Sequence, residues 1–239
     1  MTTRTQVEDV LGRSLLVGIF SLLAALQITS IADLWRAPGG FDSAATIIIS
    51  KAFALIFVLT TVFLTVKRLP PKGSATGIEP RATAIAGTFI LMVLAAVPVG
   101  RITPPVHLLA AVLIVTGTLF SIFCLFWLGR SFSVMATARR LVVRGPYAFV
   151  RHPLYVAEAV TTVGIILSNW SAAALVIGMA WCVLQYRRSI NEEAVLRATF
   201  PEYDEYARRV PRFIPDLKMP LWNVVASATG PSDGLNPDR

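Results

Sequence analysis

The chain has 239 residues, of which 55% are hydrophobic and only 15% are charged. Soluble domains carry charges on about a quarter of their residues, so this composition excludes an ordinary water-soluble globule. The net charge of +8 does not indicate a nucleic-acid partner, because in so apolar a chain the basic residues are confined to the two membrane faces.

Apolar runs bounded by charges, proline or glycine predict four transmembrane helices. They lie near residues 14–34, 44–66, 82–100 and 106–128. Each is close to the length of about 20 residues that crosses a bilayer, and we expect them to form a scaffold over residues 1–128. The loop at 67–81 is rich in proline and glycine, which indicates a flexible connector.

Two shorter apolar runs, near residues 153–168 and 171–186, are separated only by Asn169 and Trp170. They predict a tight helical hairpin whose arms each reach roughly 24 Å. The chain therefore returns to the side on which the hairpin began. The fold expected is an all-α integral membrane protein, with an active-site region at 129–215 that contains the hairpin and a partly disordered tail at 216–239.

The lysines and arginines fall almost entirely on one side of this arrangement. That side receives both termini, the loops at 67–81 and 129–152 and the basic segment after Arg187, whereas the other side has Arg36 and Arg101, with Lys51 able to snorkel from its helix end. Basic residues are retained on the cytoplasmic side during insertion. We therefore expect a multi-pass membrane protein whose termini and active site face the cytoplasm.

The first polar feature is the segment RGPYAFVRHPLY, residues 144–155, which leads into the hairpin. Its Gly-Pro pair predicts a turn, and Pro153 is well placed as the first residue of a helix. The start of that helix offers free backbone N–H groups and a positive dipole end beside Arg151 and His152. The segment suits an anion; the alternative is a basic loop that touches lipid phosphates.

The second feature is Glu158, which lies one turn beyond Tyr155 on the same helix face. A carboxylate inside a membrane segment costs a few kcal/mol unless it is paired or neutral. We expect Glu158 to face a cavity, with simple exposure at the membrane interface as the alternative.

The third feature is YRRSINEEAVLRATFPEYDEY, residues 186–206, where the last apolar run leaves the bilayer. Arg188 and Glu192 are four residues apart, and an apolar stripe continues to Tyr203, so the segment predicts a cytoplasmic amphipathic lid helix. The alternative is an exposed ion pair worth about 0.3–0.5 kcal/mol.

Because the hairpin starts and ends on one side, residues 147–155 and 188–193 should be neighbours in space. Together they would enclose a half-buried polar pocket with opposed charges, aromatic walls and a helix N-terminus. Such a pocket suits a zwitterionic, partly aromatic ligand from the cytosol that reacts with a group delivered from the lipid. No metal site is expected, because Cys124 and Cys182 lie in apolar runs without ligands at metal-binding spacing.

Two linked motifs, LVVRGPYAFVRHPLY and, after the hairpin, RRSINEEAVLRATFPEYDEYARRVPRFIP, carry a family resemblance. Over roughly residues 120–215 the chain resembles the isoprenylcysteine carboxyl methyltransferases and the related membrane phospholipid methyltransferases. The resemblance implies S-adenosylmethionine as a cofactor that binds from the cytosol, and a lipophilic acceptor that enters from the bilayer among the membrane lipids.

The resemblance also implies roles for individual residues. It places at the cofactor Arg139, Arg140, Leu141, Val142, Tyr147, His152, Pro153, Leu154, Tyr155 and Glu192. Among these, Glu192 would hold the ammonium group of the cofactor. Arg188 would orient an anionic group of the acceptor, and Glu193 completes the paired acids with its role open. The catalytic residues are accordingly expected to be Arg188, Glu193 and Glu158.

The chain departs from the family pattern at three positions. Arg139 replaces a histidine, Pro201 replaces a glycine, and Glu158 replaces an apolar or aromatic residue. Because Glu158 is an acid inside the membrane segment, it offers an alternative, in which it selects a cationic or hydroxyl-bearing acceptor.

Methyl transfer from a sulfonium is an in-line displacement, so alignment and desolvation supply most of the rate. A carboxylate acceptor needs no base, and Arg188 would be enough to position it. An amine must first lose a proton, for which Glu193, Glu158 or His152 would serve. A carboxylate or thiol-derived acceptor is favoured, and N-methylation of phospholipid ethanolamine is the alternative.

Two other functions stay open. The first is a membrane reductase of the sterol-reductase type that uses NADPH, for which Arg208, Arg209 and Arg212 could form the phosphate-binding cluster. The second is a non-enzymatic transporter or structural protein. A transporter would show polar stripes and paired broken helices near the middle of the bilayer, and the first four spans show neither clearly.

Overall fold

The computed structural model describes residues 3–38, 40–98, 100 and 102–215. The predicted tail at 216–239 lies outside the described residues. The helices are α1 Thr3–Arg36, α2 Gly40–Lys67, α3 Glu79–Phe89, α4 Pro104–Leu128, α5 Pro153–Ser168, α6 Ala172–Thr199 and α7 Tyr203–Arg209. Strands β1 Gly73–Ser74 and β2 Thr137–Ala138 form a short antiparallel pair. The protein is therefore an all-α membrane protein, as the sequence predicts.

Four helical stretches within the described residues are long and apolar enough to span a membrane. They are Asp9–Arg36, Ala44–Lys67, Glu79–Ala96 and Pro104–Ser131. These confirm the four predicted spans. The third span is less regular than expected, because α3 ends at Phe89 and continues as a 3-10 helix over Ile90–Ala96.

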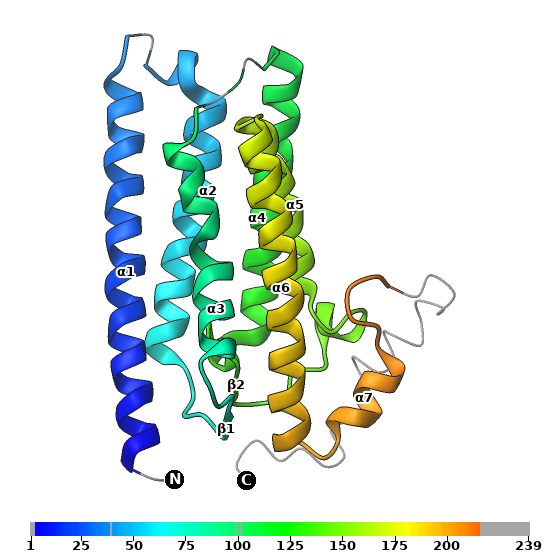
Figure 1. The fold of residues 1–239 in the computed structure, drawn as a ribbon. Helices are drawn as coiled ribbons and strands as arrows, with labels where there is room; N and C mark the ends of the chain where they lie inside the picture. Colours follow the sequence, from blue (N-terminus) through cyan, green and yellow to red (C-terminus); the bar gives the residue numbers. More distant parts are fainter. Residues whose placement is uncertain (1–2, 39, 99, 101, 216–239) are drawn as a thin grey trace.

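The long helices stand side by side, and the strands and α7 lie at the same end of the bundle as the start of α1 (Figure 1). Helix α1 packs on α2, α2 on α4, α4 on α5, and α3 on α6. Glycine makes the α4–α5 approach possible. A Cβ atom at Gly117 would lie 2.6 Å from the backbone nitrogen of Thr161 and 2.9 Å from the carbonyl oxygen of Ala157. The first arm of the predicted hairpin is thereby held tightly against the scaffold.

The second arm of the hairpin is longer than predicted. It is expected to end near residue 186, but α6 runs without a break to Thr199. Residues 187–199 contain neither glycine nor proline, and Pro201 provides the first stop signal. Phe200 before it is extended, as the residue before a proline prefers to be. Most of the predicted lid is thus the C-terminal end of α6, and α7 follows as a separate short helix.

The 67–81 connector is more ordered than its composition suggests. It pairs with the 129–152 loop through the strands and through backbone bonds from Leu69 to Arg130 and from Ala75 to Ala136, of 2.8 and 2.9 Å. These bonds tie the scaffold loop to the loop that leads into the site.

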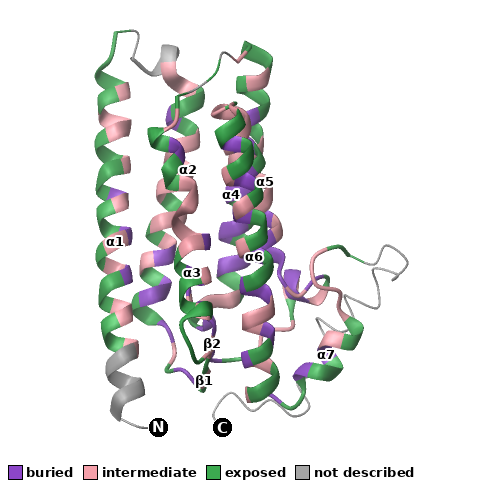
Figure 2. Ribbon diagram, in the orientation of Figure 1, coloured by how far each residue is buried: buried purple, intermediate pink, exposed green. Residues whose placement is uncertain are grey.

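Buried residues gather where α4, α5 and α6 meet, whereas few of the described side chains of α1 are buried (Figure 2). The outward faces are apolar, with Phe126 72% exposed and Met179 62% exposed. Such faces would promote aggregation in water, but they suit a hydrocarbon environment. One buried apolar cluster joins Leu16, Leu125 and Leu154, and a second surrounds Tyr203 and Tyr206 under α7.

Candidate active site

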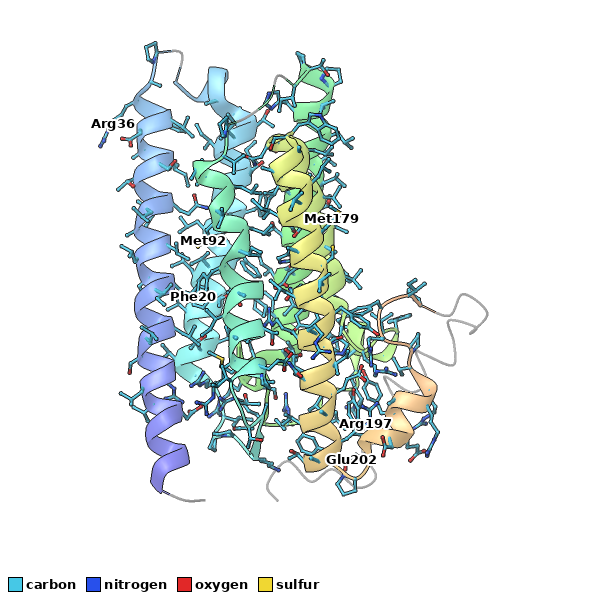
Figure 3. All side chains as sticks on the ribbon, in the orientation of Figure 1. Phe20, Arg36, Met92, Met179, Arg197 and Glu202 are labelled. Carbon is cyan, nitrogen blue, oxygen red and sulfur yellow. The ribbon has the colours of Figure 1, made fainter. Side chains whose placement is uncertain are left out.

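One cavity of about 640 Å³ runs between the helices, within the range of small-molecule sites. It is lined from α1, α2, the α3 segment, α4, the 129–152 loop, α5, α6 and α7. Phe20 from α1 and Met92 from the 3-10 segment, both labelled in Figure 3, belong to its apolar part. The cavity therefore connects the membrane-embedded half of the bundle with the loops beside α7.

Most of the predicted site residues line this cavity. They are Arg139, Arg140, Leu141, Val142, Tyr147, His152, Leu154, Tyr155, Glu158, Arg188 and Glu192. Pro153 and Glu193 are not among the lining residues. Pro153 is the first residue of α5, as predicted, and sets the start of that helix.

The approach to α5 is shaped by a glycine turn. Gly145 has a φ of +61°, and a Cβ atom there would lie 2.3 Å from the Trp127 ring, so the turn accepts only glycine. The residues that follow are clasped by the chain after α7. The amides of Arg151 and His152 donate to the carbonyl oxygens of Pro211 and Arg212 at 2.8 and 3.1 Å.

His152 joins the two predicted segments. Its Nε2 lies 3.1 Å from Oε1 of Glu193, and its Nδ1 lies 3.9 Å from Oε2 of Glu192. The imidazole stacks on the ring of Tyr155 with centroids 5.3 Å apart, and the Tyr155 hydroxyl donates to Glu192. The expectation that residues 147–155 and 188–193 are neighbours is confirmed.

Glu193 is fully buried and is surrounded by arginines. Arg212 donates to both of its oxygens at 2.8 and 2.9 Å, and Arg151 and Arg197 add bonds of 3.0 and 3.2 Å. Burial acts to raise the pKa of Glu193, but the bonds from His152 and Arg212 and the charge of Arg151 outweigh it, so this pKa lies well below its usual range. Glu193, which the sequence predicts to be catalytic, therefore does not line the cavity and instead binds His152 and the three arginines.

Arg188 lines the cavity from α6 and is buried. Its Nη1 donates to Gln185 at 2.8 Å, its Nη2 donates to the Val134 carbonyl at 3.1 Å, and its guanidinium lies 5.1 Å from the Tyr155 ring centroid. Gln185 in turn donates to Oε2 of Glu158 at 2.6 Å. Glu158 thus faces the cavity, as expected, and it is linked to Arg188 through an amide that the sequence did not single out.

The side chain of Arg139 is fully buried. It donates to Oδ1 of Asp9 at 2.9 Å and to the Leu69 carbonyl. Arg68 donates to the same Asp9 oxygen, also at 2.9 Å. The charged end of Arg139 therefore ties the loop to α1, while Leu141 and Val142 lie further along the cavity wall.

Several polar atoms at the cavity are buried and have no hydrogen-bond partner among the described residues. They are the hydroxyls of Ser131, Ser133, Tyr147 and Tyr203 and the Nε atoms of Arg139 and Arg188, and all six residues line the cavity. Buried polar groups are nearly always satisfied, so this cluster indicates a polar ligand. Sequence reasoning missed both serines and Tyr203, because hydroxyl residues in a loop carry no diagnostic spacing.

A metal centre is not apparent at this site. Within the part of the chain that the structure describes, no group of three or more His, Cys, Asp or Glu side chains could hold a metal ion.

Comparison with known proteins finds its matches in the part of the chain that contains the two sequence motifs. Residues 105–203 match the phospholipid methyltransferase family. The chain is 38% identical over 80 residues to the nickel-cobalt-cadmium resistance protein NccN of Alcaligenes xylosoxydans xylosoxydans, covering 33% of this chain and 38% of that protein. It is 36% identical over 80 residues to the cobalt-zinc-cadmium resistance protein CzcN of Cupriavidus metallidurans, covering 33% and 37%.

A third relative is the protein-S-isoprenylcysteine O-methyltransferase of Schizosaccharomyces pombe. It is 35% identical over 95 residues, which cover 36% of this chain and 40% of the relative. The chain therefore spans about two fifths of the length of the curated relatives it matches. These matches confirm the family resemblance seen in the two motifs.

Proposed function

We propose that this protein, whose residues 105–203 match the phospholipid methyltransferase family, transfers a methyl group from S-adenosylmethionine to a small lipophilic acceptor. The observation that carries the proposal is the contact of His152 and Tyr155 with Glu192 at a cavity whose lining residues also include six with a buried polar atom that lacks a hydrogen-bond partner among the described residues. A purely apolar ligand would leave those groups unpaired, at a cost of about 1–3 kcal/mol each.

The residues fit a zwitterionic, partly aromatic cofactor. Glu192 is partly exposed to the cavity and is oriented by the Tyr155 hydroxyl, so it suits an ammonium group. The first turn of α5 and His152 suit a carboxylate, because the helix start has free N–H groups and a positive dipole end. When bound, the cofactor supplies an electrophilic methyl group on its sulfonium.

The acceptor side of the cavity contains Arg188 and Glu158. Arg188 is held by Gln185 and the Val134 carbonyl, so its position is fixed before a ligand arrives, as orientation of an anionic acceptor requires. We therefore favour a carboxylate or thiol-derived acceptor. Phospholipid ethanolamine is the alternative, and in that case Glu158 is the better base, because Glu193 is occupied by arginines and lies outside the cavity.

A reductase that uses NADPH is less well supported. Arg212, which would contribute to a phosphate site, donates instead to both oxygens of Glu193, and Arg209 is paired with Glu205 at 3.2 Å. The names of two relatives refer to metal resistance, but we take from them only the shared segment, because the described residues offer no cluster of metal ligands.

The test is equilibrium binding of labelled S-adenosylmethionine to the purified full chain in detergent. We expect saturable binding that Glu192→Gln weakens by tenfold or more, on the order of a lost charged hydrogen bond. The matched control is Glu205→Gln, which changes an exposed acid on α7 and should bind like wild type. Wild-type protein without saturable binding would overturn the proposal.

The acceptor is identified by incubating the protein with labelled cofactor and extracts of membrane lipids and prenyl thiols. Carboxyl esters, methylated amines and thioethers differ in base stability and charge, so one experiment separates the three products. Labelled amine as the main product would favour phospholipid N-methylation over the acceptor proposed here.

A further inference from the structure

The end of the cavity farthest from the start of α5 is polar. Gln27 and Ser30 on α1 and Lys51 on α2 line it. Helices α1 and α2 are antiparallel neighbours. Gln27 lies nine residues before the end of α1 and Lys51 lies eleven residues after the start of α2. At 1.5 Å per residue they are about 14 and 17 Å from the connecting turn, so the two side chains lie at a similar depth.

Lys51 is an unusual residue for this position. It lies seven residues inside the span Ala44–Lys67, about 10 Å along the helix axis. A charge inside the hydrocarbon layer costs a few kcal/mol and usually faces a cavity or a partner. Lys51 is half-buried and lines the cavity, and none of the described residues forms a hydrogen bond or ion pair with its ammonium group. The sequence predicted only that Lys51 could snorkel to the surface.

The wall between the two polar ends of the cavity is largely apolar. Leu23, Phe57 and Val58 line this middle part. On α2 the lining residues extend from Lys51 to Thr61, a rise of about 15 Å. A ligand that fills the whole cavity must therefore combine a polar reacting end, an apolar chain and a second polar group.

We propose that Lys51, assisted by Gln27 and Ser30, binds an anionic group at the far end of the acceptor's apolar chain. The acceptor is then an amphiphile with polar groups at both ends, rather than a lipid with a plain hydrocarbon tail. That the ligand is a methyl acceptor rests on the proposed function. The anion site itself follows from the cavity and from the Lys51 ammonium group, which has no partner among the described residues.

The test compares two probes of equal chain length, dodecanedioate and dodecanoate, in binding to the purified full chain in phosphatidylcholine nanodiscs. Dodecanedioate carries one carboxylate for Arg188 and one for Lys51, whereas dodecanoate carries a single carboxylate. We expect wild-type protein to bind dodecanedioate about tenfold more tightly, on the order of one hydrogen bond to a charged group. Lys51→Met should remove that preference, and Lys51→Arg should retain it.

Two controls keep the result interpretable. Arg36→Met removes a positive charge at the exposed end of α1, at a residue that does not line the cavity, and it should keep the wild-type preference. Gln27→Leu changes the same end of the cavity without removing a charge, and it should reduce the preference partially. This variant tests the site even if Lys51→Met does not fold. A Lys51→Met protein that still prefers dodecanedioate would overturn the inference and leave snorkelling to the lipid surface as the role of Lys51.

Binding of labelled S-adenosylmethionine to the same preparations separates this inference from the proposed function. A preference for dodecanedioate that depends on Lys51, in protein that binds no cofactor, would support the anion site and overturn the methyltransferase proposal. Cofactor binding without any such dependence would support the methyltransferase proposal and overturn the anion site.

Discussion

The Nε2 atom of His152 lies 3.1 Å from Oε1 of Glu193, across 41 residues of sequence. This bond fixes the entrance of the hairpin against its exit. The two adjacent acids, Glu192 and Glu193, have different surroundings. Glu193 is enclosed by arginines outside the cavity, while Glu192, one residue earlier, faces the cavity and accepts from Tyr155. The structure thus separates an acid that holds the site from an acid that is available to a ligand.

Replacing Glu193 should therefore reduce stability more than any other substitution of an acid in the site. Glu193→Gln leaves the positive charges of Arg151 and Arg212 partly unpaired, and breaking a buried pair costs about 3–5 kcal/mol. Thermal unfolding in detergent, followed by circular dichroism, measures the effect. Glu205→Gln, which breaks an exposed pair with Arg209, should change stability by less than about 0.5 kcal/mol. Equal melting of the two variants would contradict the central role of Glu193.

The same carboxylate should make the protein sensitive to acid. The pKa of Glu193 in the folded protein lies below its usual value, which is about 4.3 in an unfolded chain. Its contribution to stability is therefore complete above about pH 5 and is lost as the pH falls through 4.3 toward the folded pKa. Unfolding temperatures measured from neutral pH down to about pH 3 should fall more steeply for wild type than for Glu193→Gln. Parallel curves would show that another group controls the acid response.

The sequence predicted the helices better than it predicted their ends. The spans were found because proline, glycine and charges interrupt apolar runs, and those same residues begin and end the helices. The C-terminal part of α6 was missed because hydropathy changes at Arg187 whereas helix propensity does not. The strand pair at Gly73 and Ala138 was missed because two-residue strands have no alternation to detect.

The site shows a similar division. His152, Tyr155, Arg188 and Glu192 were predicted and line one cavity. The position of Glu193 outside the cavity could not be predicted. Adjacent residues of a helix point about 100° apart, and the sequence does not show which of the two acids faces the cavity. The arginine cluster around Glu193 could not be predicted either, because its members come from three segments that only the fold brings together.

Two tyrosines offer a matched test of ligand binding. The Tyr147 hydroxyl is buried without a partner, whereas the Tyr206 hydroxyl donates to the Tyr147 carbonyl at 2.6 Å. Tyr147→Phe should leave stability unchanged or raise it by about 1 kcal/mol, because it removes an unsatisfied group, while it weakens cofactor binding several-fold. Tyr206→Phe should lower stability by about 1 kcal/mol. Unfolding and labelled-cofactor binding are measured on both variants.

A loss of stability in Tyr147→Phe, with cofactor binding unchanged, would show that the Tyr147 hydroxyl serves the fold and not a ligand. The reverse pattern is expected because an orphaned hydroxyl in a cavity gains a partner only when a polar ligand arrives.

The contact between α4 and α5 should control the site from a distance. A Cβ atom at Gly117 would meet the backbone nitrogen of Thr161 and the carbonyl oxygen of Ala157 at 2.6 and 2.9 Å, and backbone atoms cannot rotate away. Gly117→Ala should therefore push α5 outward, lower stability by about 1–3 kcal/mol and weaken cofactor binding, because His152 and Tyr155 move with α5. Gly18→Ala is the control, since nothing lies within 4 Å of its added Cβ atom, and it should be neutral or stabilise α1 by up to about 1 kcal/mol. Wild-type stability and cofactor affinity in Gly117→Ala would mean that α4 and α5 can separate without disturbing the site.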